Sequence, residues 1–269
     1  MAERREISSR FIETSRRKIP LRAFPLWMAI INATPDSFSD GGLPDPVRHA
    51  MKLVHQGADI LDVGGESTRP GSLPVSPETE IERITPVIRG IFSACRNEGI
   101  SPPPISVDTR NPETALAAIR EGAEILNDIT GGENPQMRKI ARENGTAFIF
   151  MHMRGTPRTM QISPCYEDVV EEVFAYLAHQ RDLLLSDGIQ NTRLVADPGI
   201  GFGKTTEHNL EILRNIRRFH DLDVPILVGH SRKHFLEIFG EDRREGTEKV
   251  SGWMAEAGVE ILRLHEKPK

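Results

Sequence analysis

Short runs of Ile, Val and Leu alternate along the chain with longer amphipathic stretches. The runs have the length of buried strands, and the stretches between them space their apolar residues as helices do. The predicted strands cover residues 26–32, 58–65, 104–109, 124–128, 146–152, 193–199, 225–230 and 259–265. The predicted helices lie near 45–56, 77–96, 112–121, 135–144, 166–186, 206–219 and 246–257. Eight buried strands separated by helices predict an α/β fold, a closed (β/α)8 TIM barrel rather than an open sheet.

The two ends of the chain depart from this alternation. The last predicted strand stops at residue 265 of 269, so the eighth helix is apparently missing at the C-terminus. Residues 1–22 carry seven Arg or Lys and three Glu, which indicates a basic leader, either a linker or an amphipathic helix. We therefore expect one barrel domain over 23–269. We also expect a helix over 6–18 that covers the gap between the last and first strands.

Most of the predicted strands end in a polar residue. These residues are Asn32, Asp62, Asp108, Asn127, His152, Asp197 and His265. Asp and Asn often begin turns, which would explain a single case. Seven cases among eight strands are better explained by a shared site, because the carboxyl ends of barrel strands converge on one face.

Charge and composition exclude several other functions. The chain has 34 basic and 39 acidic residues, a net charge of −5, which argues against a nucleic-acid binder. No apolar run approaches the roughly 18–20 residues that cross a membrane. The two cysteines are too few for a disulfide framework or a CxxC-type zinc site. The N-terminus also has no apolar signal region, so we expect a cytoplasmic protein.

Two segments come close to known catalytic motifs and fail at one position. The stretch GIGFGKTTE (199–207) would need Gly at 198 to be a phosphate loop, and Pro198 stands there. We interpret it as a Gly-rich turn that brings the backbone and Phe202 close to a flat ligand. The stretch GHSRKHF would need Gly at 233 to be a nucleophile elbow, and Lys233 stands there. Ser231, Arg232 and Lys233 therefore fit a polar, anion-contacting cluster better than a nucleophile.

The spacing of the histidines argues against a tightly bound zinc ion. His152, His230 and His265 lie at strand ends without zinc-ligand spacing. A loosely held Mg²⁺ remains compatible with the sequence, because Mg²⁺ keeps most of its waters. Asn32 is the candidate for a single protein oxygen on that ion.

Taken together, the motifs are similar to those of the dihydropteroate synthase family. They occur in the family's order, from about Trp27 to His265: MAIINATPDSFSDGG, GADILDVGGESTRPGSLPVS, ISVDTRNPETA, ILNDITGG, FMHMRGTPRTMQ, ADPGIGFGKTTEHNL, GHSRKHF and RLH. The resemblance implies a transferase of folate biosynthesis. Its reaction joins 6-hydroxymethyl-7,8-dihydropterin pyrophosphate to p-aminobenzoate, and releases 7,8-dihydropteroate and pyrophosphate.

The resemblance also implies roles for particular residues. The pterin-binding positions are matched by Asp108, Asn127, Ile129, Met151, Asp197, Phe202 and Lys233. A pterin edge needs a carboxylate that accepts two hydrogen bonds and an amide that both donates and accepts. The pyrophosphate positions are matched by Asn32, Arg263 and His265, with Asn32 also on Mg²⁺.

The implied mechanism is a dissociative displacement at the pterin methylene, with Mg²⁺ assisting the departure of pyrophosphate. Two loops would close over the resulting cation and keep water out. The loop and p-aminobenzoate positions are matched by Asp36, Phe38, Thr68, Arg69, Pro70 and Ser231. The residues with implied catalytic roles are Asp36, Asp108, Lys233, Arg263 and His265. Sulfonamides are the expected inhibitors.

Oligomeric state and two rival functions stay open at this stage. The resemblance implies a homodimer whose interface includes the region of the eighth helix, and the apparent absence of that helix leaves this expectation open. A pterin-dependent methyltransferase shares the fold and the pterin carboxylates, but would not need TPDSFSDGG, STRPG or SRK. A non-catalytic pterin-binding homologue would keep the binding residues and lack turnover.

Overall fold

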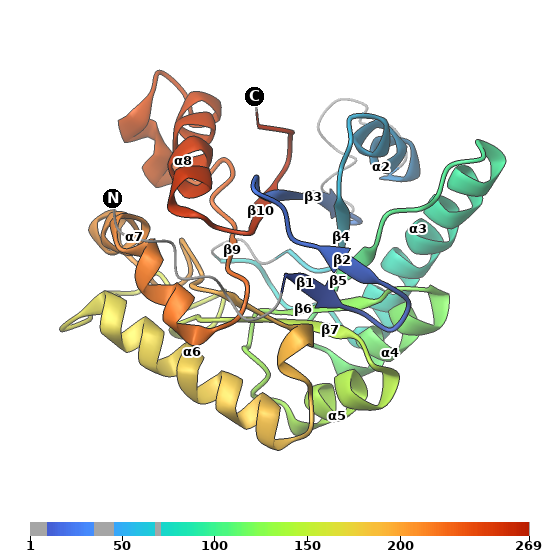
Figure 1. Cartoon of the computed structure of the whole chain (residues 1–269), viewed down its shortest axis with the longest axis horizontal. Coiled ribbons are helices and arrows are strands. Elements are labelled where there is room, and N and C mark those ends of the chain that lie inside the picture. The colour runs from blue at the N-terminus through green and yellow to red at the C-terminus, as the bar shows by residue number, and fades with distance from the viewer. Residues whose placement is uncertain (1–9, 35–45, 68–70, 269) are drawn as a thin grey trace.

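The computed structural model describes residues 10–34, 46–67 and 71–268. Eight parallel strands form its sheet (Figure 1). They are β3 (Leu26–Asn32), β4 (Ile60–Gly64), β5 (Ile105–Asp108), β6 (Ile125–Asp128), β7 (Ala147–Met151), β8 (Leu194–Asp197), β9 (Leu227–Val228) and β10 (Ile261–Leu264). Each lies inside a predicted run, so the predicted TIM barrel is confirmed.

The strand order shows how the sheet closes on itself. Neighbouring strands run β8-β7-β6-β5-β4-β3-β10-β9. A parallel bridge between Ala196 of β8 and Ile226, just before β9, joins the two ends of that order. Because all eight strands are parallel, their carboxyl ends meet on one face of the barrel, which we call the carboxyl face. The opposite end is the amino face.

The helices between the strands form the outer layer (Figure 1). They are α2 (Pro46–His55), α3 (Pro77–Asn97), α4 (Pro112–Glu121), α5 (Pro135–Asn144), α6 (Val169–Ser186), α7 (Thr206–Arg214) and α8 (Arg243–Ala257). Three short 3₁₀ helices, Asn191–Arg193, Ile216–Leu222 and His234–Phe239, complete the connections. Residues 265–268, which follow β10, contain no helix in the structure. No helix in the described ranges has the length and apolarity to cross a bilayer.

The apolar residues divide into two clusters. The larger one packs the helices on the outside of the strands, with Phe148 and Phe150 of β7 fully buried in it. The smaller one fills the barrel near the amino face. It contains Leu26, Met28, Ile60, Ile125, Ala147, Ile149, Val195, Leu227 and Ile261, together with Ile12 and Ile19 from the N-terminal segment.

The predicted helix over 6–18 is wrong for its described part. Residues 10–22 instead contain an antiparallel hairpin of β1 (Phe11–Glu13) and β2 (Lys18–Pro20). Thr14 makes the turn, since its hydroxyl accepts hydrogen bonds from the backbone N–H groups of Arg16 and Arg17. The hairpin covers the amino face, and its Ile12 and Ile19 belong to the barrel core. The segment from residue 10 is therefore part of the domain rather than a leader before it.

Candidate functional site

A buried ion cluster lies at the carboxyl face, built from side chains of four strands, β4, β5, β6 and β10. Arg263 of β10 donates from Nε to Asp62 Oδ2 at 2.6 Å and from Nη2 to Asp108 Oδ2 at 2.7 Å. Asn127 at the end of β6 donates to the same Asp62 oxygen at 3.1 Å. Asp62 of β4 pairs with Ser106 of β5, so Asp108, two residues further along β5, projects from the same face of the sheet. The cluster is thus a consequence of barrel closure.

Each carboxylate of this cluster keeps one oxygen without a protein donor. Asp62 Oδ1 and Asp108 Oδ1 are buried and accept no hydrogen bond from the described part of the chain. Burial raises the pKa of Asp108 to about 7, against the opposing effect of Arg263. Leaving a buried acceptor unpaired costs about 1–3 kcal/mol, so a ligand that donates N–H bonds here recovers that cost.

Asp197 and Lys233 form a second charged group on the same face. Asp197 Oδ1 accepts from the backbone N–H of Gly199 at 2.7 Å, and burial raises the pKa of the carboxyl. Lys233 donates to the Ile200 carbonyl, and its Nζ lies 4.5 Å from the centre of the Phe202 ring. Burial lowers the pKa of Lys233 to about 7. The lysine therefore sits at the boundary between its charged and neutral forms.

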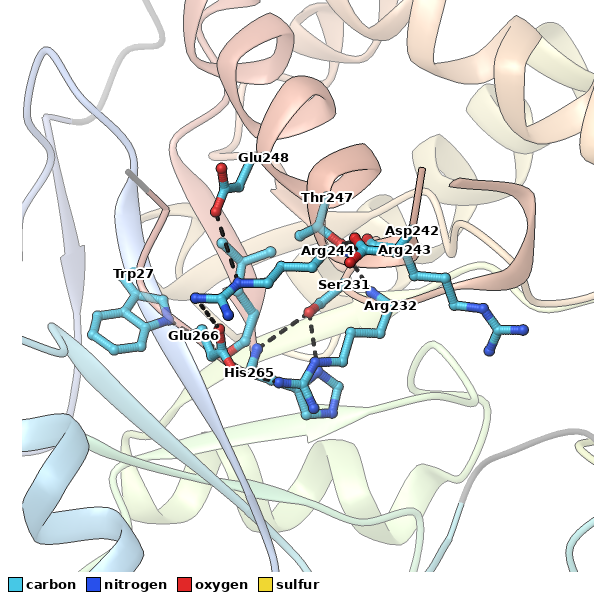
Figure 2. A network of polar contacts seen from close by, with 11 residues as sticks. Trp27, Ser231, Arg232, Asp242, Arg243, Arg244, Thr247, Glu248, His265 and Glu266 are labelled. Carbon is cyan, nitrogen blue, oxygen red and sulfur yellow. Dashed lines mark hydrogen bonds and ion pairs between the residues drawn. The ribbon is translucent and has the colours of Figure 1, made fainter. Parts of the chain in front are cut away.

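Ser231 and His265 meet at the rim of the carboxyl face (Figure 2). The His265 backbone N–H donates to Ser231 Oγ at 3.3 Å, and His265 Nδ1 lies 3.0 Å from the same oxygen. The segment after β10 is further tied to the turn after β9, since Arg232 Nη2 donates to Glu266 at 2.5 Å. Arg244 of α8 lies 3.1 Å from the other oxygen of Glu266. These contacts hold a serine predicted for p-aminobenzoate next to a histidine predicted for pyrophosphate.

Apolar side chains flank the two charged groups. Ile129 follows β6 and is buried, Met151 ends β7 in register with Asp197, and Phe202 is half-buried in the loop after β8. Only β7 separates the strands that carry Asn127 and Asp197, so both residues belong to one sector of the carboxyl face. Predicted apolar and polar pterin residues therefore share the carboxyl face.

Part of the predicted site lies in the two loops that follow β3 and β4. Asp36 and Phe38 in the first loop, and Thr68, Arg69 and Pro70 in the second, lie outside the described residues.

The fit of Mg²⁺ depends on oxygen donors. Within the described ranges no group of three or more His, Cys, Asp or Glu side chains could hold a metal. Asn32 is exposed at the carboxyl end of β3, where its amide oxygen can serve as one ligand. Mg²⁺ prefers oxygen ligands and commonly shares them with substrate phosphates and water, so the residues present fit that ion.

Three buried charged residues had no predicted role. Asp62 was identified as a strand end, yet its contact with Arg263 depends on barrel closure across 201 residues of sequence. Lys204 belongs to the Gly-rich stretch, which gave no clue that its side chain turns inward. Glu80 on α3 accepts from Thr109 and Asn111, and no sequence pattern signals that arrangement.

Comparison with known proteins assigns the chain to a family. Residues 28–265 match the family described as pterin binding enzyme. Dihydropteroate synthase of Escherichia coli strain K12 is 42% identical over 250 residues, which cover 90% of this chain and 86% of that protein.

Two solved structures share the fold over nearly their whole length. Xanthomonas albilineans dihydropteroate synthase with 4-aminobenzoic acid has a TM-score of 0.85 and 36% identity, covering 95% of this chain and 93% of that one. The Yersinia pestis dihydropteroate synthase in complex with a sulfonamide drug has a TM-score of 0.86 and 31% identity, covering 95% and 94%.

Proposed function

We propose how this chain works from the premise that it belongs to the dihydropteroate synthase family of pterin-binding enzymes. It joins 6-hydroxymethyl-7,8-dihydropterin pyrophosphate to p-aminobenzoate and releases 7,8-dihydropteroate and pyrophosphate. The observation that carries the proposal is the pair of unpaired buried oxygens, Asp62 Oδ1 and Asp108 Oδ1, beside Asn127 and Asp197. A pterin edge supplies the N–H donors that these acceptors need.

The pterin would lie between the charged groups and the apolar side chains. Asp197 and Asn127 receive and donate the hydrogen bonds of its amide-amine edge. Asp108 Oδ1 accepts from a ring N–H, and Lys233 donates to a ring acceptor. Met151, Ile129 and Phe202 contact its faces. Because Asp197 is already fixed by Gly199 N–H, its second oxygen is held in place before the ligand arrives.

Bond breaking is proposed to precede bond making. The bond between the exocyclic methylene and the pyrophosphate oxygen breaks, and both its electrons leave with pyrophosphate. Asp62 and Asp108 contact Arg263, and Asp197 is held by the Gly199 N–H. In their ionised forms these carboxylates favour the positive charge that develops on the pterin. The p-aminobenzoate nitrogen then forms the new C–N bond and loses a proton to solvent.

Pyrophosphate departure is assigned to residues at the carboxyl ends of β9 and β10. His265 and Ser231 lie together at the rim, and Arg263 points inward from the same strand. We propose that pyrophosphate binds His265 and draws Arg263 partly away from the carboxylates. Mg²⁺, when bound, would neutralise part of the pyrophosphate charge, with Asn32 supplying one ligand oxygen. Ser231 orients His265 and forms one wall for p-aminobenzoate.

Further properties of the family stay predictions for this chain. Competition between sulfonamides and p-aminobenzoate is expected from the shared site. Association as a homodimer and a cytoplasmic location are open to direct tests by sedimentation of the purified protein and by cell fractionation.

The test is pyrophosphate release from the dihydropterin substrate with Mg²⁺, with and without p-aminobenzoate. Wild type should release pyrophosphate when p-aminobenzoate is present. Asp197→Asn and Lys233→Ala should lower kcat/KM by about a hundredfold each, because each removes a charged hydrogen-bond partner of the pterin. Glu143→Gln, an exposed change on α5, is the matched control.

Two outcomes would overturn the proposal. Pterin binding without any pyrophosphate release by the wild type would indicate a non-catalytic homologue. Unchanged kcat/KM in both site variants would place the pterin elsewhere.

A further inference from the structure

Lys204 is a buried lysine to which the proposed mechanism gives no role. It follows the loop 199–203 after β8, and only 2% of its surface is exposed. Lysine is almost never this deeply buried unless its ammonium group has partners. Its partners are neutral: Nζ lies 2.8 Å from His152 Nδ1, 2.9 Å from the Gly199 carbonyl and 3.0 Å from the Phe202 carbonyl. With the His152 carbonyl at a longer 3.5 Å, these acceptors can take all the N–H bonds of an ammonium group.

Burial shifts the pKa of both side chains, and the shift of His152 fits its role as an acceptor. Burial lowers the pKa of His152 to about 2, so its ring is neutral and Nδ1 can accept. Burial also lowers the pKa of Lys204, while the nearby Asp197 carboxylate opposes that shift. The Lys204 side chain is therefore held by hydrogen bonds rather than by a contact ion pair.

The loop 199–203 is wound around this lysine. Gly199, Gly201 and Gly203 all have positive φ, at 68°, 82° and 65°, which L side chains rarely adopt. A Cβ on Gly199 would lie 1.9 Å from the His152 carbonyl oxygen, so the loop runs directly against the end of β7. Because Lys204 binds the carbonyls of Gly199 and Phe202 together, it fixes both ends of the turn.

The same turn supports three groups of the proposed pterin site. The Gly199 N–H holds Asp197 Oδ1, the Ile200 carbonyl accepts from Lys233, and the Phe202 ring lies beneath the Lys233 ammonium. A change in the turn would therefore move an acceptor, a cation and an apolar wall at once.

We propose that Lys204, anchored on His152, is a positioning residue for the pterin site, where it sets the conformation of the loop 199–203. The proposal rests on the proposed function, because it assigns the loop to the pterin half of that site. Some interactions stabilise the bound substrate and the transition state equally. Losing such an interaction raises KM and changes kcat little. A purely structural lysine would instead lower stability and weaken both substrates alike.

Four variants separate these roles. Lys204→Met removes the ammonium at similar length. His152→Leu removes the anchor, while His152→Asn keeps an acceptor near the position of Nδ1. Gln161→Ala is the matched control, because Gln161 donates to the Gly201 carbonyl of the same loop from its exposed side at 2.8 Å.

Thermal midpoint, kcat and both KM values are measured for each variant, with calorimetric binding of 6-hydroxymethylpterin. Lys204→Met and His152→Leu should raise KM for the dihydropterin substrate, and Kd for the pterin, about tenfold or more. Their KM for p-aminobenzoate should stay within about twofold of wild type. His152→Asn should restore most of the pterin affinity, and Gln161→Ala should match wild type.

The inference is overturned if Lys204→Met and His152→Leu fold and bind the pterin as wild type does. It is also overturned if both KM values change in parallel with the thermal midpoint. If Lys204→Met does not fold, the two His152 variants decide the question. A wild type that binds 6-hydroxymethylpterin but releases no pyrophosphate contradicts the proposed function alone, since binding still tests the role of Lys204.

Discussion

The two faces of the barrel both contain buried charges, and they use them differently. At the amino face, Glu124 Oε2 accepts from the Thr14 hydroxyl at 2.5 Å. Glu124 Oε1 accepts no hydrogen bond within the described residues, but it forms an ion pair with the Arg17 guanidinium at 3.1 Å. The β1–β2 hairpin brings these partners and covers them with Ile12 and Ile19. At the carboxyl face, Asp62 and Asp108 share Arg263 and each keeps an oxygen unpaired.

The difference separates charges that stabilise the fold from charges that await a ligand. Both oxygens of Glu124 have a partner on the hairpin, one by a hydrogen bond and one by an ion pair, so this carboxylate contributes to stability. Asp62 Oδ1 and Asp108 Oδ1 have neither kind of partner in the described residues. Such an oxygen is costly until a donor arrives, and such costs concentrate at functional sites. Amino-face changes should therefore alter stability and spare affinity, and most carboxyl-face changes should do the reverse.

The largest expected effect comes from the one carboxyl-face residue that should break this rule. Arg263→Met would leave Asp62 and Asp108 buried without their shared cation. Removing one partner of a buried ion cluster costs about 3–5 kcal/mol. We expect the free energy of unfolding in urea to fall by that amount, with pterin turnover lost. A variant as stable as wild type would show that the cluster is not held by Arg263.

The next effect belongs to the amino face. Ile12→Ala removes a side chain that is 1% exposed at the base of the barrel core. Large-to-small changes at such positions cost about 2–5 kcal/mol of unfolding free energy. The lower end of that range applies if the β1 strand can shift inward and fill the space. We expect a lower urea midpoint and unchanged KM for both substrates at a temperature where the variant is folded. A raised KM for the dihydropterin substrate would couple the two faces.

A smaller effect follows from the titration of Asp108. Its pKa of about 7 lies above the ordinary value of 3.8, so the carboxylate form that accepts pterin N–H bonds is lost as pH falls through 7. Affinity for 6-hydroxymethylpterin should fall about tenfold per pH unit below that point. Calorimetry between pH 5 and 7 measures this decline, and the profile of Asp108→Asn should be flat. The raised pKa also means that the contribution of Asp108 to stability decreases as pH rises from about 4 to 7.

How far the sequence predicts this molecule depends on the kind of interaction. The strand over 26–32 is predicted to the residue, because buried parallel strands are continuous apolar runs. The hairpin at 11–20 is missed, since two three-residue strands with one buried side chain each are too short for a period-two signal. Its Ile12 is recognisable as core only once the open end of the barrel is known.

The site divides in the same way. Asp108, Asn127 and Asp197 are predicted because Asp108 and Asp197 end their strands and Asn127 is the last residue but one of β6. The contact of Arg263 with Asp62 and the inward turn of Lys204 depend on three-dimensional closure, and neither leaves a local pattern.

The comparison of the two faces is tested most directly by one thermal-shift experiment on Asp108→Asn and Glu124→Gln. Wild type at 6-hydroxymethylpterin about 100 times its Kd should gain about 2.7 kcal/mol of stability. Asp108→Asn should lose the ligand-induced rise, measured from its own midpoint without ligand. Glu124→Gln should have a lower midpoint and keep the full rise. A full rise in Asp108→Asn, or its loss in Glu124→Gln, would contradict the assignment of pterin binding to the carboxyl face.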